Sequence, residues 1–204
     1  MPSNLNLVFD ALSQLSAIIS ELHISFSDRV LFSDNLYVTE HSLLSLPPDP
    51  HPHTYDESCR VAATIYLYLF LRQIPQTATI YQILLHRLRA SLNQYVGHNN
   101  LFLGSQLSNL RLLWICFIGS TASNTPSEVE SGRREWWVSI LRYVSGALGL
   151  VSKGDFDESL NCVVRMGTLG EEARAVIWNE IYVGGENVEG HKSKFNAVET
   201  AYLL

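Results

Sequence analysis

The sequence predicts an all-α fold, in the form of an irregular or solenoid-like bundle of about seven to eight helices. Apolar residues recur every three or four positions through most of the chain, which is the spacing of one face of an α-helix. A helix-length apolar segment, Cys59–Arg72, has an arginine near each end and a capping signal before it. With 204 residues, of which 47% are apolar, the chain is long enough for one domain with a substantial core.

The clearest amphipathic helix is predicted over Leu5–Leu22. Its apolar residues recur at the helical spacing and comprise Leu5, Val8, Phe9, Leu12, Leu15, Ile18, Ile19 and Leu22. The next stretch, which includes Asp34 and Asn35, is polar and irregular, so we expect only a short helical turn around His41–Leu46.

A proline-rich connector follows at residues 46–53. Each proline there removes a backbone donor and restricts the residue before it, so the connector is expected to be extended. Thr54 and Glu57 then form a capping-box pattern that begins a helix, which runs to about Gln73 and stops at Pro75. The apolar run inside this helix is shorter than the ~20 residues needed to cross a bilayer. It therefore indicates a buried core helix and no membrane partner.

The same periodicity predicts five further helices, at Thr79–Leu92, Ser105–Ile118, Glu135–Leu148, Asp155–Val164 and Glu171–Tyr182. The first of these should form a hairpin with the preceding helix and direct Ile83 inward. The polar segment Thr121–Ser131 is expected to be a surface loop. We therefore expect one helical domain over residues 1–183, followed by a flexible tail over residues 184–204.

Charge and cysteine content narrow the function classes. The net charge of −6 disfavours duplex DNA as a partner of the whole chain, because non-specific DNA affinity comes mainly from Lys and Arg. The arginines between Ser58 and Ser127 are expected at the ends and on the solvated faces of helices. Cys59, Cys116 and Cys162 are widely separated, which is typical of free buried thiols in an intracellular protein. The N-terminus lacks the pattern of a secretory signal, so secretion is not expected.

The candidate metal patterns are incomplete. His51, His53 and Cys59 lie close together, but a structural zinc site normally needs two closely spaced ligand pairs, and no second pair follows. Asp155–Glu158 resembles the start of a calcium loop, yet Leu160 stands where the turn requires glycine. We expect no metal and no cofactor.

Catalytic patterns are also incomplete. Ser105 and Ser120 each follow a glycine, but neither has the second glycine or the preceding strand of a nucleophile turn. No glycine-rich phosphate loop is present. The sequence therefore predicts no catalytic residue, and we do not expect an enzyme.

Aromatic residues are the remaining candidates for a binding role. Because aromatic rings give large apolar contacts and freeze few rotors, they line either ligand pockets or protein cores. The candidate residues, as pocket or core aromatics, are Tyr66, Trp114, Trp136, Trp137 and Trp178. One hypothesis is that a ligand or a partner helix docks in a groove that they line.

Three segments carry a resemblance to a known family. Cys59-Arg60-Val61-Ala62-Ala63-Thr64-Ile65-Tyr66-Leu67 resembles a helix in the regulatory region of fungal zinc-cluster transcription factors. Arg111–Gly119, with its Leu-Leu-Trp core, and Arg133–Leu141, with its paired tryptophans, are similar to later helices of that region, in the same order. The likeness spans Leu12 to Tyr182 and extends to Asp155–Val164 and Ala173–Ile181.

The resemblance implies a regulatory function. In that family, a module of six cysteines holds two zinc ions and reads DNA, and the helical region regulates activity. Three scattered cysteines do not make that module, so the chain is expected to represent the C-terminal part of the regulatory region, as a truncated gene product or as a complete stand-alone protein.

The resulting expectation is a transcription-regulator-type helical module that binds a protein partner or a small apolar effector and has no DNA-binding part of its own. The alternative is a stand-alone helical protein that binds a small molecule and has no transcriptional role. A nuclear location is implied by the resemblance, although Arg133-Arg134 is too short for a basic targeting signal, so a cytoplasmic location stays open.

Overall fold

The computed structural model describes residues 4–20, 26–46, 56–98, 106–130 and 132–183. Every regular element within these ranges is helical, which confirms the predicted all-α class. The ranges contain α1 (Asn4–Ser20), α2 (Phe26–Ser45), α3 (Asp56–Tyr66), a π-helical segment η1 (Leu67–Leu71), α4 (Thr79–His98), α5 (Gln106–Ala122), α6 (Pro126–Glu130), α7 (Arg133–Ala147), α8 (Lys153–Asn161) and α9 (Glu171–Val183). The predicted connector, the Thr54 capping box and the tail lie outside the described residues.

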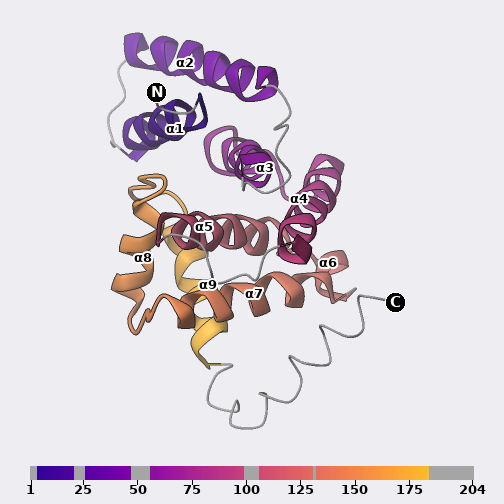
Figure 1. Cartoon of the computed structure of the whole chain (residues 1–204). Coiled ribbons are helices and arrows are strands. Elements are labelled where there is room, and N and C mark those ends of the chain that lie inside the picture. Colours follow the sequence, from indigo (N-terminus) through magenta and orange to yellow (C-terminus); the bar gives the residue numbers. More distant parts are fainter. Residues whose placement is uncertain (1–3, 21–25, 47–55, 99–105, 131, 184–204) are drawn as a thin grey trace, which may run out of the picture.

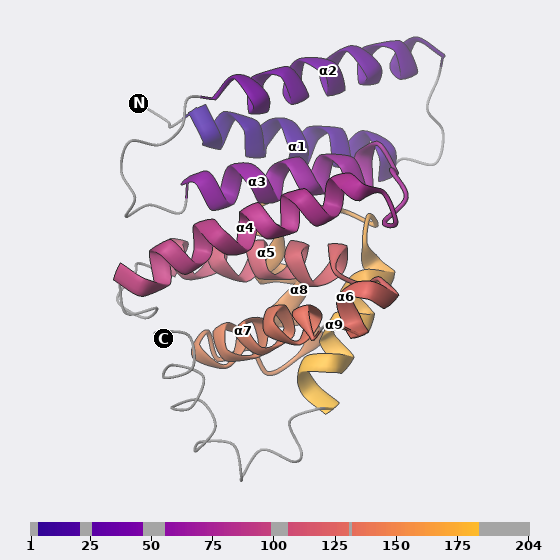
Figure 2. The same cartoon turned by 90° about the vertical axis from the view of Figure 1, so that its right-hand side faces the viewer.

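The helices stack in layers around α5 (Figure 1). Helix α2 lies at one edge of the stack, with α1 and α3 beneath it, as Figure 2 shows from the side. Helix α5 contacts α3 and α4 on one side and α7, α8 and α9 on the other. No helix in the described ranges combines the length and the hydropathy that a membrane crossing requires.

Helix α2 corrects the expectation of a polar, irregular segment with a short turn at His41–Leu46. It is one continuous helix of 20 residues. Its inner side carries Phe32, Leu36, Thr39 and Leu43 at helical spacing, and it packs on α1 and α3. Because apolar residues also occur on its outer side, the amphipathic pattern is blurred, and burial against two other helices determines the structure.

Smaller differences have local causes. The predicted surface loop at Thr121–Ser131 contains the short helix α6, whose Glu128 is buried and pairs with Arg133 at 2.8 Å. The predicted inward position of Ile83 is wrong, because this side chain is exposed, while Leu84 and Leu85 are buried. A step of one residue rotates a side chain by about 100° around the helix, which separates these neighbours.

The helix that begins at Asp56 ends much as predicted. It passes into η1, where the Arg72 amide donates to the Leu67 carbonyl at 2.9 Å. Gln73 then adopts a positive φ of 51°, and the chain leaves the helix before Pro75. Inside this segment, Tyr66 is fully buried, and its hydroxyl shares a 2.6 Å hydrogen bond with the Ser16 hydroxyl of α1.

The crossing of α5 and α7 is unusually close at Gly119. A Cβ atom at this position would lie 2.5 to 2.7 Å from ring atoms of Trp137, which is too short for a real contact. Trp137 is buried, so the bulk of its indole is held by packed neighbours. The absence of a side chain at residue 119 therefore allows the two helices to meet.

Two glycine substitutions are expected to change stability in opposite directions. Gly119→Ala should destabilise the protein by about 1–3 kcal/mol because it overpacks the Trp137 contact. Gly146→Ala is the matched control, since Gly146 is also helical but has open space around its Cβ direction. It should stabilise by about 0.5–1 kcal/mol through the better helix propensity of alanine. Urea unfolding of both variants measures the difference, and equal effects would contradict the close crossing.

Candidate functional site

The five aromatic residues proposed from the sequence do not share one site. Tyr66, Trp114 and Trp137 are almost fully buried in the core. Trp136 and Trp178 are partly buried and pack against the core from its edge. Of the two alternatives, pocket or core, the position of Tyr66, Trp114 and Trp137 corresponds to the core. A ligand-binding role for any of the five residues stays a prediction.

Ring contacts divide these residues into three groups. The Tyr66 and Trp114 centroids lie 5.9 Å apart, and Trp114 also meets Phe9 edge-on at 5.5 Å. Trp136 and Trp137 form an edge-to-face pair at 4.6 Å. In the third group, Trp178 makes tilted ring contacts with Phe156 at 5.6 Å and with Tyr182 at 4.3 Å. Such pairs add about 0.5–1.5 kcal/mol each beyond the burial of their area.

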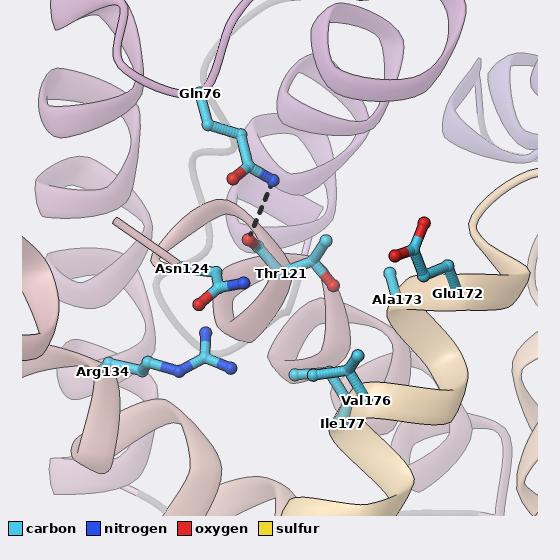
Figure 3. A pocket seen from close by; sticks show the side chains of 8 residues that line it. All are labelled: Gln76, Thr121, Asn124, Arg134, Glu172, Ala173, Val176 and Ile177. Atoms are coloured by element: carbon cyan, nitrogen blue, oxygen red, sulfur yellow. Dashed lines mark hydrogen bonds between the residues drawn. The ribbon is translucent and has the colours of Figure 1, made fainter. Parts of the chain in front are cut away.

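A recess with a mixed polar and apolar lining lies where α5, α7 and α9 meet (Figure 3). We call it the Arg134 hollow; its volume is about 200 Å³. Its lining residues come from the turn before α4, from the end of α5 and the turn after it, and from the starts of α7 and α9. They are Gln76, Thr121, Asn124, Arg134, Glu172, Ala173, Val176 and Ile177. The volume is below the roughly 300–1,000 Å³ of pockets for drug-sized ligands. The space therefore suits a small polar molecule or a single inserted side chain.

Arg134 determines how the three helices meet. Its buried guanidinium donates to the Ser120 carbonyl at the end of α5, at 2.5 Å, and to both carboxylate oxygens of Glu180 on α9, at 2.7 and 2.9 Å. A planar guanidinium can make these bonds at once, whereas a lysine ammonium lacks the fork. One side chain of α7 thus holds both α5 and α9.

Other polar groups in the hollow are less committed. The Gln76 amide donates to the Thr121 carbonyl at a long 3.4 Å, as the dashed line in Figure 3 shows. The Asn124 and Glu172 side chains are exposed and have no hydrogen-bond partner among the described residues, and Asn124 lies between Thr121 and Arg134 in the same view. These amide and carboxylate groups can bind a polar ligand, while Val176 and Ile177 give it an apolar wall.

A second recess, of about 260 Å³, lies between α4 and α7. Its lining is rich in cationic and polar side chains and consists of Gln82, Leu85, His86, Arg89, Glu128, Arg133 and Trp137. Arg89 also covers the face of Trp136, with its guanidinium carbon 4.8 Å from the ring centre. Arg133 and Glu128 already pair with each other in this recess.

The cysteines divide into two buried residues and one exposed residue. Cys59 and Cys116 are fully buried, and Cys162 is exposed, which corrects the expectation that all three are buried. Burial raises the pKa of the Cys59 thiol to about 12, and it also raises the pKa of Cys116. Because the thiolate is the metal ligand and the nucleophile, both buried residues are inert at neutral pH. His51 and His53, the other members of the candidate zinc pattern, lie outside the described residues.

Within the described ranges, no three residues among His, Cys, Asp and Glu are grouped for a metal ion. The residues of the Arg134 hollow were not predicted as a site from the sequence. Arg134 itself stood out only as half of a short basic pair, and the other lining residues lie on separate elements. No local spacing links Gln76, Asn124 and Glu172, so only the tertiary structure brings them together.

The model of a protein family described as a fungal specific transcription factor domain matches residues 3–160. The comparisons with curated proteins and with solved structures gave no match. The matched range includes α1 to α7 and nearly all of α8, but not α9. The Arg134 hollow therefore lies between the matched helices and a helix outside the match.

Thiol labelling should distinguish the three cysteines. In the native protein, one equivalent of a thiol-reactive disulfide reagent should react rapidly, at Cys162, and two more should react after unfolding in denaturant. Cys162→Ser should remove the rapid equivalent only. Rapid reaction of two or three thiols in the native protein would contradict the burial of Cys59 and Cys116.

Arg134→Met should destabilise the protein by about 2–3 kcal/mol, since it removes the charge-assisted bonds to the Ser120 carbonyl and to the Glu180 carboxylate. Lys153→Met is the control. It breaks a more exposed ion pair with Asp157 four residues along α8, and it should cost less than about 0.5 kcal/mol. Denaturant unfolding measures both, and a loss at Arg134 no larger than that at Lys153 would show that Arg134 does not hold the helices together.

Proposed function

The chain belongs to the fungal specific transcription factor domain family, and from this premise we propose that it regulates transcription by binding a small polar effector, or a polar side chain of a partner protein, in the Arg134 hollow. It is a module of the transcription-regulator type. We propose further that neither catalysis nor the reading of DNA bases belongs to this chain, and that it acts in the nucleus.

The observation that supports the binding site is the combination of uncommitted polar groups with a contact that holds helices together. Asn124 and Glu172 line the hollow without partners among the described residues; Asn124 lies beside Arg134, and Glu172 lies on α9 across the hollow from it. A ligand that bonds to Asn124 is placed next to the contacts between Arg134, Ser120 and Glu180, and one that also reaches Glu172 contacts α9 directly. Binding can thus be linked to the position of α9.

The mechanism is a population shift. A ligand changes an equilibrium between two packings only if it binds one of them better. A ligand that contacts Asn124 on the α5 side and Glu172 on α9 binds best when the two helices keep one spacing. It therefore favours that arrangement of α9, and a transcriptional partner recognises the resulting surface.

The chemistry of the hollow modifies one expectation from the sequence. A small apolar effector was expected, but four of the lining side chains, Gln76, Asn124, Arg134 and Glu172, carry amide or charged groups. Burying such groups against an apolar ligand costs their hydrogen bonds. A polar or zwitterionic ligand avoids that cost, and we propose this class instead.

The net charge of −6 supports the exclusion of base reading. Phosphate contacts by Lys and Arg provide most of the affinity of proteins for DNA. In this chain, Arg60, Arg72 and Arg133 are paired with carboxylates, so they are only partly available to phosphates.

A reporter assay tests the regulatory function. The chain, fused to an unrelated DNA-binding module in yeast, should change reporter expression relative to that module alone. Val176→Trp should abolish the change, because an indole at this half-exposed position fills the hollow. Val151→Trp is the matched control, since Val151 is more exposed and does not line the hollow.

The two parts of the proposal can fail separately. A fusion that leaves reporter expression unchanged would contradict the regulatory function and favour a binding protein with no transcriptional role. A fusion whose effect is the same with either tryptophan would retain the regulatory function and exclude the Arg134 hollow as its site.

A further inference from the structure

The outer face of α2 carries the largest group of exposed apolar side chains on any described helix. Thirteen large apolar side chains are exposed among the described residues, and five of them, Val30, Leu31, Tyr37, Val38 and Leu44, lie on α2. Their exposed fractions range from 47% to 67%. Single exposed apolar residues are normal, but five on one face of one helix form a patch of the kind that marks an interaction site.

This face points away from the rest of the protein. Helix α2 is at the edge of the stack, and its contacts are with α1 and α3 on its inner side (Figure 2). Around the helix, the five apolar residues form two rows, with Asp34 and His41 between them. We define the α2 outer face by these seven residues, all of which are exposed.

The order of residues along the face is nearly the same in both directions. Leu31, Asp34, Tyr37, Val38, His41 and Leu44 are separated by three, three, one, three and three positions. A second α2 helix, turned by 180° about an axis between Tyr37 and Val38, therefore brings Leu44 to the level of Leu31 and Val38 to the level of Tyr37, and each apolar row lies along the same row of the other copy. A surface that matches itself under a two-fold rotation is what a symmetric dimer requires.

The charged residues select this orientation. In the antiparallel pair, Asp34 of each copy faces His41 of the other, so a carboxylate meets an imidazole at two symmetric positions. A histidine can donate an N–H to a carboxylate in its neutral form and adds a charge when protonated. In a parallel symmetric pair, each residue would face its own copy, and two Asp34 carboxylates would repel each other. Charge complementarity thus exists only in the antiparallel arrangement.

We propose that a second copy of this chain covers the α2 outer face, and that the two α2 helices pair antiparallel across a two-fold axis between Tyr37 and Val38. This dimer goes beyond the proposed function and does not depend on the Arg134 hollow. Stable interfaces use about 20–30 residues on each side, whereas this face has seven. The dimer is therefore weak, with a dissociation constant on the order of micromolar.

Sedimentation velocity over a micromolar concentration series of the full 204-residue chain tests the dimer. The wild type should change from monomer to dimer with increasing concentration. Asp34→Lys places an ammonium opposite His41, and His41→Glu places a second carboxylate opposite Asp34. Each should weaken dimerisation about tenfold or more, because each substitution removes the complementary contact at both symmetric positions.

The two charge variants also provide a rescue. When they are mixed, the lysine introduced in one chain meets the glutamate introduced in the other, and the unchanged His41 and Asp34 meet as before, so the mixture should form a heterodimer. The double variant D34K/H41E should likewise dimerise. Circular dichroism checks that each variant is folded, which is expected because both positions are exposed.

A matched pair of apolar variants tests the location. Leu31→Asp should abolish the dimer, while Ile83→Asp, at an almost equally exposed position on α4, should not change it. A wild type that stays monomeric over the series would overturn the proposal and leave the α2 outer face to a different protein. A dimer that resists Leu31→Asp would place the interface elsewhere, and failure of the mixed charge variants to associate would exclude the antiparallel register.

Discussion

The complete burial of the centre of α5 is the constraint on which the structure depends. Seven consecutive residues, from Leu112 to Ile118, are at most 1% exposed. Seven residues pass almost twice around a helix, so this segment has no solvent side and must be surrounded by other elements. Helices α3, α4, α7, α8 and α9 provide those surroundings. The layered arrangement follows from this requirement, and Gly119 allows the closest of these neighbours, α7, to approach.

The later helices are attached to this core by arginines as well as by apolar contacts. Arg134 joins α7 to α5 and α9, and Arg142 donates to the Glu180 and Ile181 carbonyls. Arg174, also buried, pairs with Asp157 of α8 at 3.1 Å and donates to the Leu169 and Gly167 carbonyls in the turn before α9, at 2.6 and 3.0 Å. A hydrogen bond can be exchanged for one with a ligand at small net cost, whereas a buried apolar contact has no such replacement. Helix α9 is therefore the element of the fold best suited to respond to a polar ligand.

The helices around α5 could be predicted from the sequence because their apolar spacing is regular and their ends carry ordinary breakers. Helix α2 could not, since Asp34 and His41 interrupt its outer apolar rows, and the inner row from Phe32 to Leu43 becomes informative only when α1 and α3 are in place. The aromatic residues were identified, but periodicity does not distinguish a core ring from a pocket ring. The Arg134 hollow was missed for a different reason, because its residues are brought together from separate elements by the packing of α9.

The α2 outer face is separate from the Arg134 hollow, since no residue that lines the hollow lies on α2. Pairing of two chains through α2 would consequently leave both hollows open, and each copy could bind its ligand without loss of the dimer. The α5 core resists gradual deformation because it is closely packed. A dimer of this kind presents two copies of the surface that includes α9. A partner with two matching sites then gains affinity through effective concentration, even when each single contact is weak.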